Sequence, residues 1–118
     1  MPTDFVTNWQ TQARKGLLEL SVLNALRGTR MYGYEIAKRL QEIPGLMVVE
    51  GTIYPIMSRL QKEGLVTSSL EPSPDGPARK YYRLSEDGEA ALDRINGIWE
   101  EIAEGVTVLR RGSDGADG

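Results

Sequence analysis

The 118 residues include neither cysteine nor histidine, which excludes disulfides, thiol chemistry and the usual zinc sites. No apolar run is long enough to span a membrane and the N-terminus lacks the features of a signal peptide, so we expect a cytosolic protein. Residues 1–84 carry 11 Lys and Arg against 8 Asp and Glu, whereas residues 85–118 carry 3 against 9. Phosphate binding depends on local charge, so the net charge of −3 does not exclude an anionic partner for the first 84 residues.

The first part of the chain predicts two helices separated by a short turn. Residues 1–12 are polar with scattered apolar groups, and form either an N-terminal arm or the start of the first helix. Between residues 13 and 26 apolar side chains cover a wide helical face, and Gly28 follows where a terminating glycine is common. The second helix is predicted over residues 33–42, because Pro44 and Gly45 end it.

A third helix is predicted from near Thr52 to Glu63. Thr52 is a favourable N-cap, and it places Pro55 at the third helical position, where the missing N–H has no intrahelical partner. The apolar run before it, residues 46–49, is either a buried turn or a single strand beside the later hairpin. Periodicity leaves the outward side of this helix to Tyr54, Pro55, Ser58, Arg59 and Lys62.

A two-stranded hairpin with a proline-rich tip is expected next. Residues 65–71 predict one strand, residues 72–77 a loop, and residues 79–84 a second strand with clearer alternation. Arg79 and Lys80 flank the loop. They form either a phosphate clamp or a charged edge that discourages strand aggregation.

The chain closes with a long helix over residues 85–111, which Ser85 caps. Its apolar positions recur in alternating steps of three and four residues, which is a heptad seam. A helix attached only at its start should pack on a partner, and a second copy of the chain is the simplest one. Residues 112–118 predict a disordered tail. The seam residues, predicted as a dimer interface, are Leu92, Ile95, Trp99, Ile102, Val106 and Leu109.

This order of elements predicts a mainly α protein with a small β hairpin. We expect a winged helix-turn-helix over residues 13–84, followed by a C-terminal dimerisation helix. The third helix would suit the major groove of double-stranded DNA. Arg59 can form a bidentate contact with a guanine edge, whereas Ser58 and Lys62 suit phosphates.

Each of these DNA contacts has a structural alternative. The outward side of the third helix can be an ordinary solvated face, and Tyr54 can instead pack against the second helix. Thr52 can serve only as a cap, although a phosphate at that helix N-terminus fits both roles. Tyr32 and Tyr34 either reach the DNA backbone or fill the core.

Six motifs, taken together in their order and spacing, resemble the PadR family of bacterial transcription regulators. The resemblance covers roughly residues 14–109, and the single helix after the hairpin is similar to the small PadR-like members. The motifs are Tyr32-Gly33-Tyr34-Glu35-Ile36, Gly51-Thr52-Ile53-Tyr54-Pro55, Arg59-Leu60, Lys62-Glu63-Gly64-Leu65, Arg79-Lys80-Tyr81-Tyr82 and Leu84-Ser85-x-x-Gly88.

The resemblance implies a homodimer, joined by the last helix with help from the first, that represses a promoter by binding an inverted repeat in the bacterial nucleoid. It also implies release by a small-molecule effector. In some small relatives a tryptophan of the last helix stacks on flat aromatic ligands. Trp99, with Ile95 beside it, lies on the equivalent seam, where it either packs the dimer core or binds such a ligand.

Two other classes of function remain to be compared. A winged-helix module whose third helix faces a protein would have the same fold, because fold alone does not determine function. An enzyme would need a nucleophile–base pair, a metal cluster or a phosphate-binding loop, and the sequence contains no recognisable one. We therefore expect no catalytic activity and no cofactor.

Overall fold

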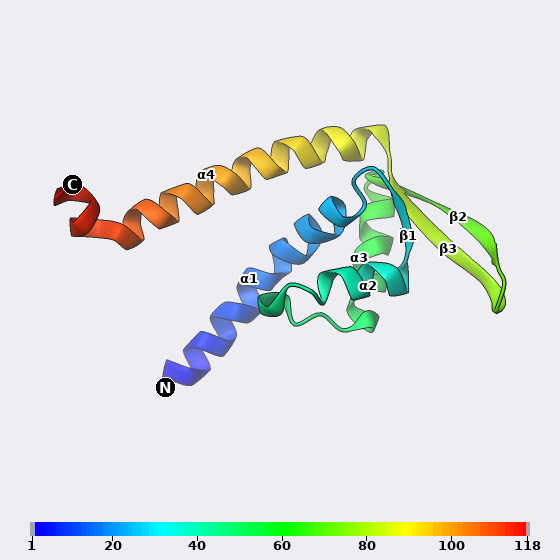
Figure 1. Ribbon diagram of the computed structural model, residues 1–118, viewed down its shortest axis with the longest axis horizontal. Coiled ribbons are helices and arrows are strands. Elements are labelled where there is room, and N and C mark those ends of the chain that lie inside the picture. Colours follow the sequence, from blue (N-terminus) through cyan, green and yellow to red (C-terminus); the bar gives the residue numbers. More distant parts are fainter. Residues whose placement is uncertain (1, 118) are drawn as a thin grey trace.

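The computed structural model describes residues 2–117, with side chains described for residues 4–112. Over this range the elements follow in the order α1, β1, α2, a 3-10 turn (η1), α3, β2, β3 and α4. Figure 1 shows α1 and α4 leaving a compact winged body on the same side and diverging, so that the molecule measures 60 × 35 × 22 Å. The predicted class, mainly α with a small β hairpin, is confirmed. None of the described helices is long and apolar enough to cross a membrane.

Helix α1 spans Pro2–Ala25, so residues 2–12 are the first half of a helix rather than a separate arm. Its C-terminal half packs in the core through Val22 and Leu23, which are almost fully buried. Its N-terminal half leaves the body, and Phe5 and Trp9 are exposed there.

Helix α2 spans Gly33–Leu40 and buries Ile36 and Leu40. After the turn η1 (Pro44–Leu46), the chain continues without regular structure to Val49. Leu46 and Val48 are buried, which confirms the buried turn among the two alternatives for residues 46–49.

Helix α3 spans Glu50–Lys62 and begins before the predicted N-cap. Val49 is the actual cap residue, because its extended backbone (φ −114°, ψ 152°) marks the last non-helical position. Thr52 therefore lies inside the first turn, and its predicted capping role is wrong. Pro55 lies nearly one turn deeper than predicted, where its missing N–H leaves the carbonyl of the exposed Gly51 to solvent.

The sheet has three antiparallel strands in the order β1-β3-β2, one more than predicted: β1 (Arg30–Tyr32), β2 (Val66–Ser73) and β3 (Gly76–Leu84). The hairpin tip is shorter than the predicted loop, because Ser73 already pairs with Gly76. The pairing register shifts around Pro72, where a bulge accommodates a residue that cannot donate to the ladder.

Helix α4 spans Glu86–Asp117, with a break at Gly112, whose φ is 47°. The predicted cap is present, since the Gly88 N–H donates to Ser85 Oγ over 2.9 Å. The helical backbone continues beyond the break to Asp117, and Gly118 lies outside the described residues. The disordered tail over residues 112–118 stays a prediction.

The start of α4 is held against α1 by two polar contacts. The side-chain amides of Asn24 and Asn96 donate to each other over 3.0 and 2.9 Å. Arg27 also pairs with Asp93 over 2.6 Å. These contacts fix the direction in which α4 leaves the body.

Candidate nucleic-acid interface

The predicted contact residues of α3 fall on three sides of the helix. Its core side is buried through Ile53, Met57 and Leu60. The opposite side faces solvent. Tyr54 lies on the flank toward α2, and Thr52 and Arg59 lie on the flank toward α1. The residues of the solvent-facing side are Gly51, Pro55, Ser58 and Lys62.

Ser58 and Lys62 are exposed and available to a partner. Within the described part of the chain, neither side chain makes a hydrogen bond or an ion pair. The two residues lie four positions apart, so they are neighbours on the helix surface. This pair of unengaged polar groups is the part of α3 best suited to a phosphate backbone.

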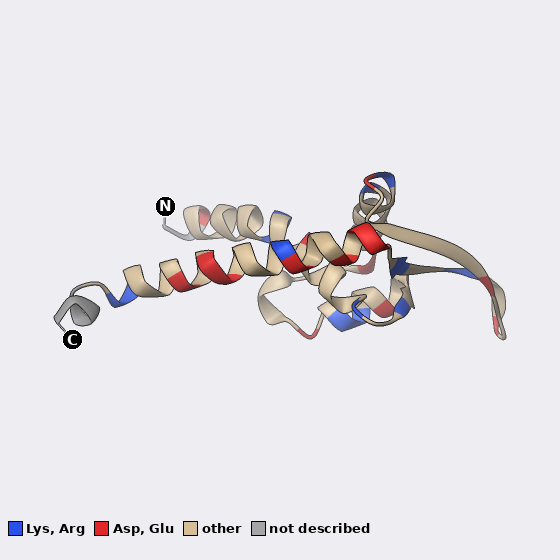
Figure 2. Ribbon diagram, turned by 90° about the horizontal axis from the view of Figure 1, so that it is seen from above, with Lys and Arg blue, Asp and Glu red and all other residues tan. Residues whose placement is uncertain are grey.

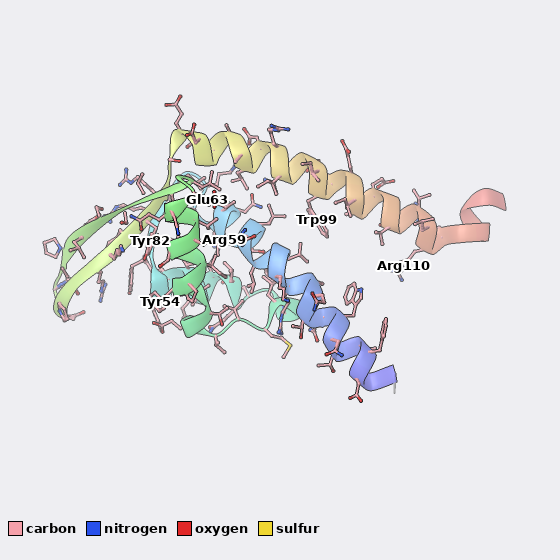
Figure 3. The ribbon with its side chains drawn as sticks, turned by 180° about the vertical axis from the view of Figure 1, so that it is seen from behind. Tyr54, Arg59, Glu63, Tyr82, Trp99 and Arg110 are labelled. Carbon is pink, nitrogen blue, oxygen red and sulfur yellow. The ribbon has the colours of Figure 1, made fainter. Side chains whose placement is uncertain are left out.

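Arg59 is engaged with the first helix. Its Nη1 pairs with Oε2 of Glu19, and its side chain is 68% exposed while that of Glu19 is 27% exposed. Figure 3 shows Arg59 between α3 and α1. An ion pair this exposed contributes about 0.2–1 kcal/mol, so an anionic partner can displace Glu19.

Tyr54 packs against the first residue of α2 while keeping its hydroxyl at the surface. A Cβ on Gly33 would come within 2.5 Å of Tyr54 Cε1, so only glycine allows this approach. The hydroxyl donates to Glu50 Oε2 over 2.6 Å. This hydrogen bond, with partial burial and the Glu50 charge, raises the pKa of Tyr54 to about 12.

Arg79 and Lys80 point to opposite faces of the hairpin, because they are consecutive in β3. Arg79 shares its face with Glu71, its partner across the β2–β3 ladder. Lys80 shares its face with Tyr82, which is buried against the body (Figure 3). The two cations therefore cannot clamp one phosphate together.

Three tyrosines gather at the base of the hairpin. Tyr32 stacks on Tyr34 with ring centroids 6.2 Å apart and meets Tyr81 edge-on at 5.3 Å. Arg30 lies over Tyr81 and Lys38 lies over Tyr34. Figure 2 shows acidic residues recurring along α4, whereas α2 and the base of the sheet carry several basic ones.

The sequence singled out Tyr32 and Tyr34 in this cluster but gave no role to Arg30, Lys38 or Tyr81. The alternation Arg79, Tyr81, Arg83 along β3 was the available signal. Its significance depended on β1, which has only three residues and no visible pattern.

The predicted seam of α4 is divided between the body and solvent. Leu92 is 1% exposed and packs in the core of the chain itself, so it has almost no surface left for the predicted dimer interface. Ile95 is half-buried against the same core. The reason is that the first turns of α4 lie on α1. The remaining seam residues are exposed: Trp99, Ile102, Val106 and Leu109.

Trp99 and Ile95, predicted to share a ligand, line different hollows. Trp99 points from α4 toward α1 (Figure 3). It borders a hollow of about 560 Å³ together with Leu17, Ser21 and Leu46. Ile95 borders a separate hollow of about 380 Å³ on the α3 side of α1.

The chain is similar to a known protein family and to a relative from Mycobacterium tuberculosis. The model of the family "Transcriptional regulator PadR-like family" matches residues 22–94. The transcriptional regulator Rv3488 of Mycobacterium tuberculosis is 31% identical over 93 residues, which are 79% of this chain and 85% of that protein.

Solved structures agree with the family match. A PadR family transcriptional regulator from Eggerthella lenta has a TM-score of 0.79 and 32% identity, covering 93% of this chain and 96% of that one. Bacillus subtilis PadR, solved in complex with operator DNA, has a TM-score of 0.59 and 26% identity, covering 65% of this chain and 45% of that one.

Proposed function

Because the chain belongs to the PadR-like family of transcriptional regulators, we propose that it binds a promoter operator with α3 in the major groove. The observation that carries this proposal is the exposed side of α3, where Ser58 and Lys62 are unengaged. The similarity to Bacillus subtilis PadR, a protein solved with operator DNA, supports it. A single helix face of this kind fits a groove about 12 Å wide.

The α3 residues divide into two roles in this proposal. Lys62 and Ser58 bind phosphates and position the helix. Arg59 leaves Glu19 and reads a guanine edge, because an arginine can donate to both guanine acceptors at once. The proposed contact set is Tyr34, Thr52, Tyr54, Pro55, Ser58, Arg59, Lys62, Arg79 and Lys80.

We further propose that the protein acts as a homodimeric repressor in the cytoplasm, on the bacterial nucleoid. An apolar stripe on α4 is formed by Trp99, Ile102 and Val106. These three residues are 40%, 52% and 54% exposed, respectively. Such a continuous stripe is typical of an interface. The helix of a second subunit would cover it between α1 and α4, where Phe5 and Trp9 are also exposed. Two subunits then meet two halves of an inverted repeat.

A small-molecule effector would bind in the hollow beside Trp99. The hollow combines apolar groups with the amide of Asn96, which suits a flat aromatic molecule carrying a polar group. Since α4 also forms the proposed interface, a ligand there would change how the two subunits are placed. Release from the operator would follow from that change.

Selection of random DNA duplexes on the purified protein at two salt concentrations tests the proposal. We expect an enriched inverted repeat with half-site centres about 10 base pairs apart and affinity that falls steeply with salt. A folded dimer that enriches no sequence would contradict it. That result would favour the alternative of a winged-helix module that binds a protein.

A further inference from the structure

A hollow of about 380 Å³ lies where α1, the end of α3 and the N-terminal half of α4 meet. Leu20, Leu65 and Ile95 give this hollow apolar walls. Glu19 of α1 and Glu63 at the end of α3 border it as well. Its volume lies within the range of about 300–1,000 Å³ that is common for small-molecule sites, and such sites combine apolar walls with a few charged groups.

The hollow already contains one cation, which is the guanidinium of Arg59. This guanidinium pairs with Glu19, whose side chain is 27% exposed. Glu63 follows Arg59 by about one helical turn, and within the described chain its carboxylate makes no hydrogen bond or ion pair. Figure 3 shows Glu63 at the end of α3, beyond Arg59. One guanidinium against two carboxylates leaves the lining of the hollow negatively charged.

Glu63 also lies at an unfavourable place for a negative charge, because it is the C-cap residue of α3. The last carbonyl groups of a helix lack intrahelical partners, and they repel a carboxylate and attract a cation. The basic residues of the last turn are Arg59 and Lys62. The first is paired with Glu19 and the second is exposed on the solvent-facing side. The end of α3 therefore favours a further cation in the hollow.

Operator binding would take the guanidinium away from the hollow, since Arg59 reads a guanine edge in the proposed function. Glu19 is largely buried, and a carboxylate that loses its cation in such a place is destabilised. Glu63 stays unpaired, and both carboxylates then lie near the negative backbone of the DNA. A cation that takes the place of Arg59 would offset this cost.

We propose that the hollow binds a hydrophobic organic amine, whose ammonium group replaces the guanidinium of Arg59 between Glu19 and Glu63. The apolar part of the amine packs on Leu20 and Ile95. An inorganic ion fits less well, because the walls are apolar and the described residues contain no group of three or more metal-ligating side chains. The amine raises operator affinity because it releases Arg59 for the DNA. This effect on the operator rests on the proposed role of Arg59.

Calorimetric titration of the DNA-free protein with phenethylamine tests the site. The matched probes are 2-phenylethanol and phenylacetate, which carry the same ring with a neutral and an anionic group. The wild type should bind phenethylamine about tenfold more tightly than 2-phenylethanol, because the ammonium group donates to carboxylates. Phenylacetate should not bind.

Charge variants locate the ammonium group. Glu63→Gln and Glu19→Gln should each weaken phenethylamine binding by about tenfold. Glu42→Gln is the matched control, since Glu42 borders the other hollow, beside Trp99. It should leave phenethylamine binding unchanged.

Gly16→Leu fills the hollow without changing any charge. Gly16 borders the hollow, and nothing lies within 4 Å of the position where a Cβ would stand. Leucine is also a better helix former than glycine, so the variant should keep the fold and its circular dichroism spectrum. It should abolish phenethylamine binding and still bind the operator.

Operator affinity measures the release of Arg59. Saturating phenethylamine should raise the affinity of the wild type up to about fivefold over sodium chloride at the same concentration, because an exposed ion pair of this kind no longer has to be broken. Glu19→Gln should show no further rise. The operator should in turn raise the affinity for phenethylamine by the same factor, since coupling between two sites is reciprocal.

Four results would overturn the inference or separate it from the proposed function. Equal binding of phenethylamine and 2-phenylethanol would show that the carboxylates hold no ammonium group. Loss of binding in Glu42→Gln and not in Glu63→Gln would place the amine beside Trp99. Amine binding without any change in operator affinity would contradict the release of Arg59. Amine binding that depends on both glutamates, in a protein that binds no duplex, would contradict the proposed function and confirm the site.

Discussion

Gly88, in the first turn of α4, lies directly against the carbonyl group of Leu65, just after α3. A Cβ on Gly88 would overlap that carbonyl oxygen. Around this contact the Ser85 N–H donates to the Leu65 oxygen over 3.0 Å, and Ser85 Oγ donates to the Gly64 oxygen over 2.6 Å. The Leu65 N–H in turn donates to the Leu60 oxygen in α3 over 2.9 Å. The end of α3 and the start of α4 are therefore packed and hydrogen-bonded together, and we call this contact region of residues 64–65 and 85–88 the joint.

Gly88→Ala should destabilise the fold by about 1–3 kcal/mol, because the added methyl group has no space at the joint. Gly97→Ala is the matched control. Gly97 lies in the same helix with nothing near its Cβ position, so that change should stabilise the protein by roughly 0.5–1 kcal/mol. Chemical denaturation measures both, and a Gly88→Ala protein as stable as the wild type would disprove the close contact.

Glu19→Gln should raise operator affinity up to about fivefold, because Arg59 no longer leaves an ion pair worth up to about 1 kcal/mol. Glu42→Gln removes the same charge just after α2, where the ion-pair partner of Glu42 among the described residues is Arg39, at 4.0 Å. Its effect should be smaller. Fluorescence anisotropy with labelled operator measures both variants, and equal effects would mean that Glu19 acts only through its charge.

Ile102→Glu combined with Val106→Glu should produce monomers, because two charges would enter the proposed interface. Val108→Glu is the control, since Val108 is exposed on another side of α4. Sedimentation velocity gives the mass of each. A double variant that remains dimeric would place the interface elsewhere.

The Tyr54 hydroxyl should lose its proton near pH 12 in the folded protein. Its pKa is raised on folding, so the stabilisation is complete below about pH 10, the unfolded pKa, and is lost as pH rises toward 12. Glu50→Gln removes the main cause and should move the titration back toward pH 10. The ultraviolet absorbance of the phenolate records this titration when the absorbance of the Tyr54→Phe variant is subtracted from that of the protein that retains Tyr54. Titration of Tyr54 near pH 10 in the wild type would contradict the Glu50 contact.

Local patterns predicted the elements well, because helix periodicity and the Ser85 cap act over a few residues. The start of α3 was misplaced because Thr52 has the chemistry of a cap, while the extended backbone of Val49 depends on the buried turn before it. The short strand β1 offered no pattern of its own.

The site was harder to predict because its contacts join distant segments. Periodicity placed Arg59 outward, but its partner Glu19 is on α1. Leu92 fitted the heptad, yet the packing of α4 on α1 decides that it is buried. The contacts of Tyr32 and Arg30 with Tyr81 likewise require β1 to pair with β3. Sequence periodicity predicts on which side of a helix or strand a residue lies. It does not predict which other part of the chain packs against that side.

The salt dependence of operator binding by the wild type and by Lys62→Ala tests most directly whether the exposed side of α3 holds DNA. Arg94→Ala, which removes an exposed cation from α4, is the control. We predict that Lys62→Ala weakens binding to all duplexes alike and lowers the slope of log affinity against log salt by about two per dimer, while Arg94→Ala leaves the slope unchanged. An unchanged slope and affinity for Lys62→Ala would contradict the account.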